Sequence, residues 1–298
     1  MTLRWGVGLY LLPGLLWAAD PEVRKIAELT HPPLTEVSGI ARSGYPGVYW
    51  VHNDSGDAAR IFAIDRTGAP LVPPFQRDAL EGKPWPGIAI RDAWNVDWED
   101  LAVANGVIYL AETGNNGNGR RDLGVYLVME PNPLAVAETR ALTFLPVAYP
   151  DQDGYPGSQW HFDCEALFVD NGTLYFLTKH RRSGEITGWE AGTALYRLDS
   201  RHTDEMNVLT LVSRRADVIL PTAADLSPTG DRLAVLTYLA LWIFPRPATE
   251  DDWLAGTPRV ITFDREVIPI AEAITWENDE RLLIANEGRG LYEVDVGR

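Results

Sequence analysis

Three glutamates and one serine stand at matching places in a repeated pattern of this 298-residue chain. Each lies at the start of a short, partly apolar segment: Ser38 in SGIA, Glu99 in EDLA, Glu165 in EALF and Glu272 in EAIT. Oxygen donors without histidine or cysteine suit Ca²⁺ or Mg²⁺ rather than zinc. If such carboxylates converge, either their pKa values rise or a cation lies among them. The pattern therefore predicts a metal site of Ser38, Glu99, Glu165 and Glu272, with Ca²⁺ as the first choice and Mg²⁺ as the alternative.

A strand repeat must position these side chains. Five copies begin at residues 38, 99, 165, 224 and 272, and each continues through a turn rich in Gly, Asn or Asp into a second and a third strand. A weaker fourth strand follows in four copies, but the chain ends before the fifth copy supplies one. Residues 23–30 form an unassigned strand near the N-terminus that can take its place. The sequence predicts an all-β fold, a β-propeller of five four-stranded blades closed by this N-terminal strand. Six blades are the alternative, with the extra one in residues 149–163.

In a propeller the first strand of each blade lines the central channel, so the aligned residues form a ring in which the fourth copy contributes Ala224. The loops that join second to third strands open on the same face as the starts of the first strands, and polar residues recur there in every copy. A mixture of acids, amides and cations above an acidic channel predicts a site for a small polar ligand. The residues expected to bind it are Asn53, Asp54, Glu112, Lys179 and Glu287. The alternative is that the ring glutamates only join neighbouring blades through backbone amides.

The ends and the composition of the chain indicate its surroundings. Arg4, a short apolar stretch and Ala18-Ala19 before Asp20 predict a signal peptide over residues 1–19, followed by a single propeller domain over 20–298. We therefore expect a periplasmic or secreted protein with no membrane span after signal removal. Cys164 is the only cysteine, so no internal disulfide can form. A net charge of -16 argues against nucleic acid as a partner, and we expect a monomer.

The repeat segments also resemble a known group of proteins. The stretches VSGIARS, VYWVHNDSG, RIFAIDRTG, DWEDLA, IYLAETGNN, DCEAL, LYFLTK, ADLSPTGDRLAVLTY and AEAI are similar to those of exported bacterial β-propellers that are mostly without an assigned activity. The ring further resembles the five-bladed calcium-activated nucleotidases. That resemblance implies a central Ca²⁺ at Ser38, Glu99, Glu165 and Glu272, with Ala224 departing from the pattern. The other substrate-binding motifs of that class are not found, so nucleotide hydrolysis is not implied.

Two classes of function follow from these residues. If the protein is an enzyme, we expect metal-assisted hydrolysis of phosphoesters or lactones, in which the candidates for catalysis are Glu99, Glu165 and Lys179. A channel glutamate would orient water, and Lys179 would neutralise developing charge. Otherwise we expect a non-catalytic ligand-binding protein or a protein-interaction scaffold. An exposed aromatic patch on the loop face would favour the scaffold.

Overall fold

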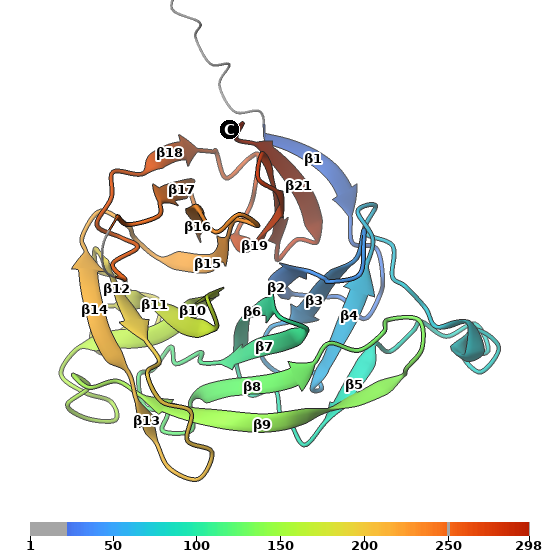
Figure 1. Ribbon diagram of the computed structural model, residues 1–298, viewed down its shortest axis with the longest axis horizontal. Helices are drawn as coiled ribbons and strands as arrows, with labels where there is room; N and C mark the ends of the chain where they lie inside the picture. The colour runs from blue at the N-terminus through green and yellow to red at the C-terminus, as the bar shows by residue number, and fades with distance from the viewer. Residues whose placement is uncertain (1–22, 249–250, 298) are drawn as a thin grey trace, which may run out of the picture.

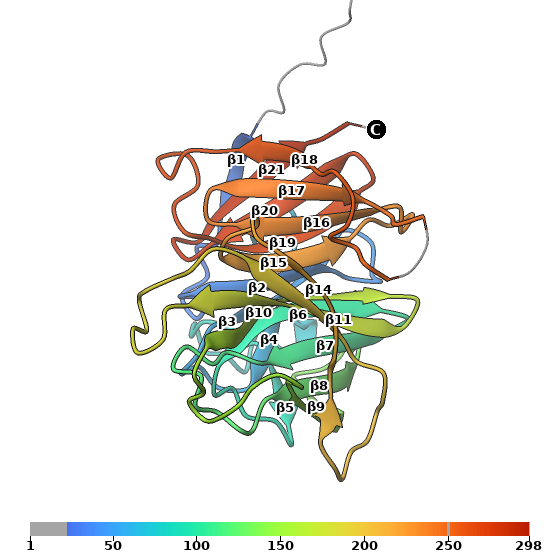
Figure 2. The same ribbon diagram turned by 90° about the vertical axis from the view of Figure 1, so that its left-hand side faces the viewer.

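Each sequence repeat folds into antiparallel strands, and the sheets stand around a common axis like the blades of a propeller (Figure 1). This computed structural model describes residues 23–248 and 251–297, so the signal predicted over residues 1–19 lies outside the described part. Figure 2 shows the same ring from the side. The prediction of an all-β propeller is confirmed.

The strands are named here by their place in a blade. The innermost strands are β2 (Val37–Arg42), β6 (Trp98–Ala104), β10 (Trp160–Asp170), β15 (Pro221–Leu226) and β19 (Ala271–Asn278). The second strands are β3 (Tyr49–Asn53), β7 (Val107–Glu112), β11 (Thr173–Arg181), β16 (Arg232–Thr237) and β20 (Arg281–Asn286). The third strands are β4 (Arg60–Ile64), β8 (Gly124–Met129), β12 (Thr193–Arg197), β17 (Ala240–Pro245) and β21 (Gly290–Asp295). The outer strands are β5 (Ile88–Arg91), β9 (Glu138–Ala148), β14 (Thr210–Arg215), β18 (Arg259–Thr262) and β1 (Val23–Glu28).

The two ends of the described chain close the ring. Strand β1 pairs antiparallel with β21, so that Val23 lies opposite Val294 and Glu28 lies opposite Gly290. This pairing places the N-terminal strand outermost in the last blade, in the sheet order β1-β21-β20-β19. The predicted closure by the N-terminal strand is confirmed. It covers an edge that would otherwise be open to pairing with another chain.

One junction departs from separate sheets. The outer strands β5 and β9 of neighbouring blades pair in parallel, and the short strand β13 (Asn207–Val208) also pairs with β9. These contacts merge two blades into one nine-stranded sheet. Dividing that sheet at the β5–β9 contact and setting β13 aside gives two four-stranded units, which with the three other sheets make five in the described residues. Of residues 149–163, where a sixth blade was the alternative, 149–159 form no strand and 160–163 belong to β10.

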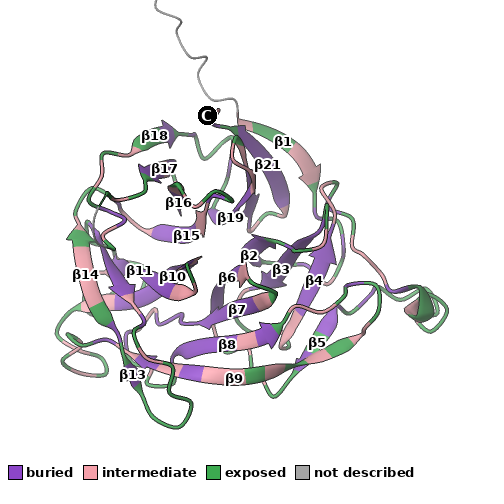
Figure 3. Cartoon of the chain, in the orientation of Figure 1, coloured by how far each residue is buried: buried purple, intermediate pink, exposed green. Residues whose placement is uncertain are grey.

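The core lies between the blades. The five inner strands are buried along most of their length, whereas most residues of the outer strands are half-buried or exposed (Figure 3). Apolar side chains on both faces of the inner and second strands therefore pack against the next blade, as Trp50 and Trp98 do in one such cluster. This two-sided burial explains why these strands read as continuous apolar runs. The described helix is one 3-10 turn, η1 (Pro74–Gln76), and no helix in the described residues is long and apolar enough to cross a membrane.

Candidate functional site

A β-bulge interrupts every inner strand at the same place. The pairing with the second strand shifts between Val37 and Gly39, and the equivalent shift occurs in the other four blades. The residues held at these shifts are Ser38, Glu99 with Asp100, Glu165, Thr222 and Glu272. Bulges redirect side chains and recur beside functional sites. The predicted ring residues Ser38, Glu99, Glu165 and Glu272 therefore hold equivalent positions.

The fourth member of the ring is Thr222, and the assignment to Ala224 is wrong by two residues. The shift in that blade falls between Pro221 and Ala223. Thr222 is buried, and its hydroxyl donates to the Ala271 carbonyl of the next blade at 2.9 Å. Ser38 bonds in the same way to the Glu99 carbonyl of its next blade, at 2.8 Å. A bulge adds a residue that alignment of apolar runs does not register, and so the fifth oxygen-bearing side chain was missed.

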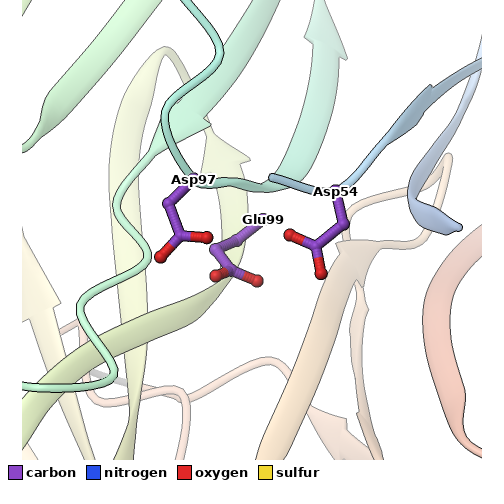
Figure 4. Close-up of side chains that lie close together, drawn as sticks. All are labelled: Asp54, Asp97 and Glu99. Carbon is purple, nitrogen blue, oxygen red and sulfur yellow. The ribbon is translucent and has the colours of Figure 1, made fainter. Parts of the chain in front are cut away.

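Carboxylates gather at one end of this ring in two groups that share Glu99. Asp54, Asp97 and Glu99 form the first group, shown in Figure 4, and Glu99, Asp163 and Glu165 form the second. In each group one oxygen from every residue lies within 4.8 Å of the others. The predicted pair Glu99 and Glu165 is thus brought together, whereas Glu272 belongs to neither group among the described residues.

Asp97 and Asp163 were not predicted, although the sequence carries a signal for both. Each precedes a ring glutamate by two residues, in Asp97-Trp98-Glu99 and in Asp163-Cys164-Glu165. Side chains two apart on a strand point to the same face, so an acid at this spacing joins the glutamate that follows it. The two copies that carry this spacing supply every member of the two carboxylate groups except Asp54.

Because neighbouring side chains of a strand point to opposite faces, the predicted ligand residues at the ends of the second strands are of two kinds: some face the acidic groups and others lie behind them. Asn53 and Glu112 are buried and are the sixth residues of the second-strand segments that begin at Val48 and Val107. The Asn53 amide accepts from Thr35 N at 3.0 Å and donates to the Pro33 carbonyl at 2.8 Å. The Glu112 carboxylate accepts from the backbone N–H groups of residues 96 and 97 at 2.9 and 3.0 Å. Both side chains hold the loop that leads into the inner strand of their own blade.

The seventh position, one residue further, faces the acidic groups instead. Asp54 stands there in the first carboxylate group, and Lys179, Tyr238 and Glu287 are its counterparts in three other blades. The Lys179 ammonium contacts the Glu165 carboxylate and donates to the Tyr238 hydroxyl at 2.9 Å. Of the predicted ligand residues, Asp54, Lys179 and Glu287 therefore surround the site. Asn53 and Glu112 support it from the layer behind.

Basic side chains neutralise only the second carboxylate group. Arg181 donates from Nε to Asp163 at 2.7 Å and from Nη2 to Glu165 at 3.1 Å, while Lys179 pairs with the other Glu165 oxygen. Among the described residues, no lysine or arginine forms an ion pair with the first group, made of Asp54, Asp97 and Glu99. The two groups thus differ in charge as well as in position. In the described residues only the second group forms ion pairs with lysine or arginine, although the more distant charges of Arg120 and Lys179 act on Asp97 and Asp54.

Burial and mutual repulsion perturb the protonation of the site. Burial, followed by the neighbouring charges of Asp54 and Asp163, raises the pKa of Asp97 to about 7. Burial likewise raises the pKa of Glu272 to about 7, with Lys179 opposing the rise. The pKa of Glu99 lies well above its usual range, through burial and then the charge of Glu165. These acids cannot all ionise near neutral pH without a compensating cation.

Two further aspartates, the buried Asp100 and the half-buried Asp225, join neighbouring blades. Asp100 lies at the bulge of β6, and its carboxylate accepts from Leu101 N, Leu167 N and Ala224 N at 2.8, 2.9 and 3.2 Å. Asp225 accepts from the Thr275 hydroxyl at 2.9 Å and from Trp276 N at 2.7 Å. Asp100 and Asp225 thus join blades through backbone amides, which is the role that the alternative expectation gave to the ring glutamates.

Comparison with protein-family models and with curated proteins found no match to this chain. Among solved structures, the PQQ-bound aldose sugar dehydrogenase of Streptomyces coelicolor is 12% identical over 93% of this chain and 99% of that chain, with a TM-score of 0.49. A gluconolactonase of Xanthomonas campestris is 14% identical over 93% of this chain and 90% of its own, with a TM-score of 0.46. The Pan2 WD40 domain of Neurospora crassa is 10% identical over 96% and 98%, with a TM-score of 0.47. Likeness at this level says nothing about a reaction or a ligand.

Proposed function

We propose that this chain is an exported, monomeric β-propeller that holds one divalent cation at Asp54, Asp97 and Glu99. Ca²⁺ is the first choice and Mg²⁺ the alternative, because the donors are all carboxylate oxygens. The observation that carries the proposal is the contrast between the two carboxylate groups, since in the described residues lysine and arginine form ion pairs with the second group but none with the first. Of the predicted ligands Ser38, Glu99, Glu165 and Glu272, only Glu99 is kept in this proposal. Asp54 and Asp97, at the loop face, are added as the other two ligands.

The donors of the first group fit a hard cation. Two of its members, Asp54 and Asp97, are partly exposed, whereas Glu99 is buried, so the group reaches from solvent toward the interior. Flexible carboxylates of this kind bind one or both of their oxygens to Ca²⁺. The remaining positions around a Ca²⁺ ion would be taken by water or by a polar ligand.

For the reaction, we propose hydrolysis of a phosphoester or a lactone. When bound, the cation would supply Lewis-acid polarisation of a phosphoryl or carbonyl oxygen. Lys179 and Arg181 hold the Glu165 carboxylate in place and keep positive charge beside the cluster. A channel glutamate, Glu99 or Glu165, would orient the attacking water.

A turnover assay tests this proposal. The mature chain, stripped with a chelator, is incubated with a panel of phosphoesters and lactones in Ca²⁺, in Mg²⁺ or in chelator. We expect hydrolysis only with metal, loss of both metal binding and turnover in Asp97→Asn, and retention of both in Glu190→Gln. Glu190 is a suitable control because it is an exposed acid of the same face that pairs with His161. Turnover that persists in chelator would contradict the metal-assisted mechanism. Metal binding without turnover of any substrate would contradict the proposed hydrolysis and favour a non-catalytic binding protein.

The non-catalytic alternative also has an observation in its favour. Aromatic side chains are exposed in loops on the same face as the acidic groups, with Trp94 at 74% and Trp189 at 50% exposure. An exposed aromatic patch on that face is the feature expected of an interaction scaffold.

A further inference from the structure

Exposed apolar side chains concentrate on the loop face. Of the fifteen large apolar residues that are exposed in the described chain, eight lie in loops that lead into inner strands or join second to third strands. They are Trp94, Val96, Tyr155, Ile186, Trp189, Leu239, Val267 and Ile270. The loop of Trp94 and Val96 borders the first carboxylate group, since it leads into Asp97 and its Asn95 donates to the Asp54 carbonyl at 2.9 Å. Exposed apolar groups gathered on one face of a protein mark binding surfaces.

One part of this face combines apolar side chains with acids and is here called the Glu287 patch. It consists of Glu36, Leu239, Val267, Ile270 and Glu287. Its loops are joined by backbone hydrogen bonds: Glu287 N donates to the Ile270 carbonyl at 3.3 Å, and Phe263 N, at the start of the loop that carries Val267 and Ile270, donates to the Leu239 carbonyl at 3.0 Å. The charges of Asp54 and Glu36 act on Glu287. No ion pair of Glu36 or Glu287 forms within the described residues, although Arg265 and Arg289 belong to the same loops.

Ile270 has a backbone conformation that its side chain does not favour. Its φ is 44°, in the left-handed region where a β-branched residue is an outlier, and its side chain is 42% exposed. Glycine or asparagine would adopt this conformation at less cost. An apolar branched side chain that is both strained and exposed contributes little to the core. Such outliers occur where the surrounding structure holds a residue for binding.

From these observations we infer that the loop face docks a polypeptide segment. A lysine or arginine of the segment lies against Glu36 and Glu287, and its apolar neighbours cover Leu239, Val267 and Ile270. Charge complementarity favours this occupant, because the patch and the chain, at a net -16, are acidic. An anionic membrane and a second copy of the chain would both be repelled. The inference goes beyond the proposed cation site and uses neither Asp97 nor Glu99.

A peptide library with a matched neutral twin provides the test. Acetylated and amidated pentapeptides carry a central lysine flanked by Leu, Val, Phe or Trp, and the twin library carries norleucine in place of lysine. Binding to the full mature chain in saturating Ca²⁺ is measured by fluorescence anisotropy. We expect members of the lysine library to bind at least tenfold more tightly than their norleucine twins, which corresponds to about 1.4 kcal/mol. Binding should weaken as salt is raised, because the charges are exposed.

Surface variants locate the binding. Glu287→Gln and Ile270→Ser should each weaken binding at least fivefold, whereas the control Glu190→Gln should leave it unchanged. Both test residues are partly exposed, so the variants should melt like the parent. The inference is overturned if no lysine peptide binds below about 1 mM, if the norleucine twins bind equally well, or if anionic vesicles bind and the peptides do not. Ca²⁺ binding is measured on the same variants, so that failure of the cation site in Asp97→Asn is distinguished from failure of docking in Glu287→Gln.

Discussion

Removal of the Lys179 ammonium should destabilise the fold strongly, because it leaves a buried carboxylate without its main partner. The side chains of Lys179 and Glu165 are 2% and 6% exposed and form an ion pair. Burial alone would lower the pKa of Lys179, but the charges of Glu165 and Glu272 reverse this and raise it well above its usual value. Lys179 therefore stays charged throughout the neutral range.

The size of the effect follows from what remains in Lys179→Met. Methionine fills a similar volume, and Arg181 still contacts Glu165 at 3.1 Å. Breaking one side of a buried ion pair costs about 3 to 5 kcal/mol, and the remaining arginine contact places this variant near the lower end. The double variant Lys179→Met, Glu165→Gln removes both charges and should recover most of the loss, to within about 1 kcal/mol of the parent.

Urea unfolding in chelator at pH 7 measures both variants, with equal m-values as the check on two-state behaviour. At pH 5 the loss in Lys179→Met should shrink. Burial already raises the pKa of Glu165, and without its lysine the carboxyl takes up a proton more readily as the pH falls. The reasoning is refuted if the single variant loses less than about 1 kcal/mol, or if the double variant loses as much as the single one.

Three further outcomes are expected. Ca²⁺ at about a hundred times its dissociation constant should stabilise the parent chain by roughly 2.7 kcal/mol, whereas the Asp97→Asn variant should have the same melting temperature in Ca²⁺ and in chelator. An equal rise of the melting temperature with Ca²⁺ in parent and variant would argue against the assigned ligands. In chelator, the raised pKa values of Asp97 and Glu272 give a contribution to stability that is complete below about pH 4 and is lost as the pH rises through about 7. Because Ca²⁺ binds the ionised carboxylates, Ca²⁺ affinity should increase between pH 5.5 and 7.5. An affinity that does not change with pH would be the contrary result. Deletion of residues 20–30 removes β1 and the buried Leu29 and exposes the edge of β21, so urea unfolding should show a large loss of stability that parent-like melting would disprove.

The architecture was predictable because it rests on periodicity. Apolar runs broken by turn residues fix strands, and five copies of one pattern with an unpaired N-terminal strand leave few alternatives to a closed ring. The pairing of β1 with β21 follows because the fifth copy lacks a fourth strand and the N-terminal strand lacks a partner. Local sequence and global topology agree in this respect, which is why the fold follows from the pattern.

The site was only partly predictable because β-bulges and the alternation of side chains along a strand decide where single residues point, and the repeat pattern does not record either. Thr222 was missed since a bulge shifts the register of β15, and Asn53 and Glu112 were grouped with Asp54 although neighbouring residues of a strand point to opposite faces. The neutralisation of Glu165 by Lys179 and Arg181 depends on contacts between side chains, which spacing does not reveal. The difference between the two carboxylate groups therefore required the structure.

The central claim is that a divalent cation is held by Asp54, Asp97 and Glu99. Crystals of the mature chain grown in Ca²⁺ and measured at long wavelength would locate the ion by its anomalous signal. We predict one peak about 2.3 to 2.6 Å from an oxygen of each of these three carboxylates. A peak among Ser38, Glu165 and Glu272, or no peak at saturating Ca²⁺, would contradict the account.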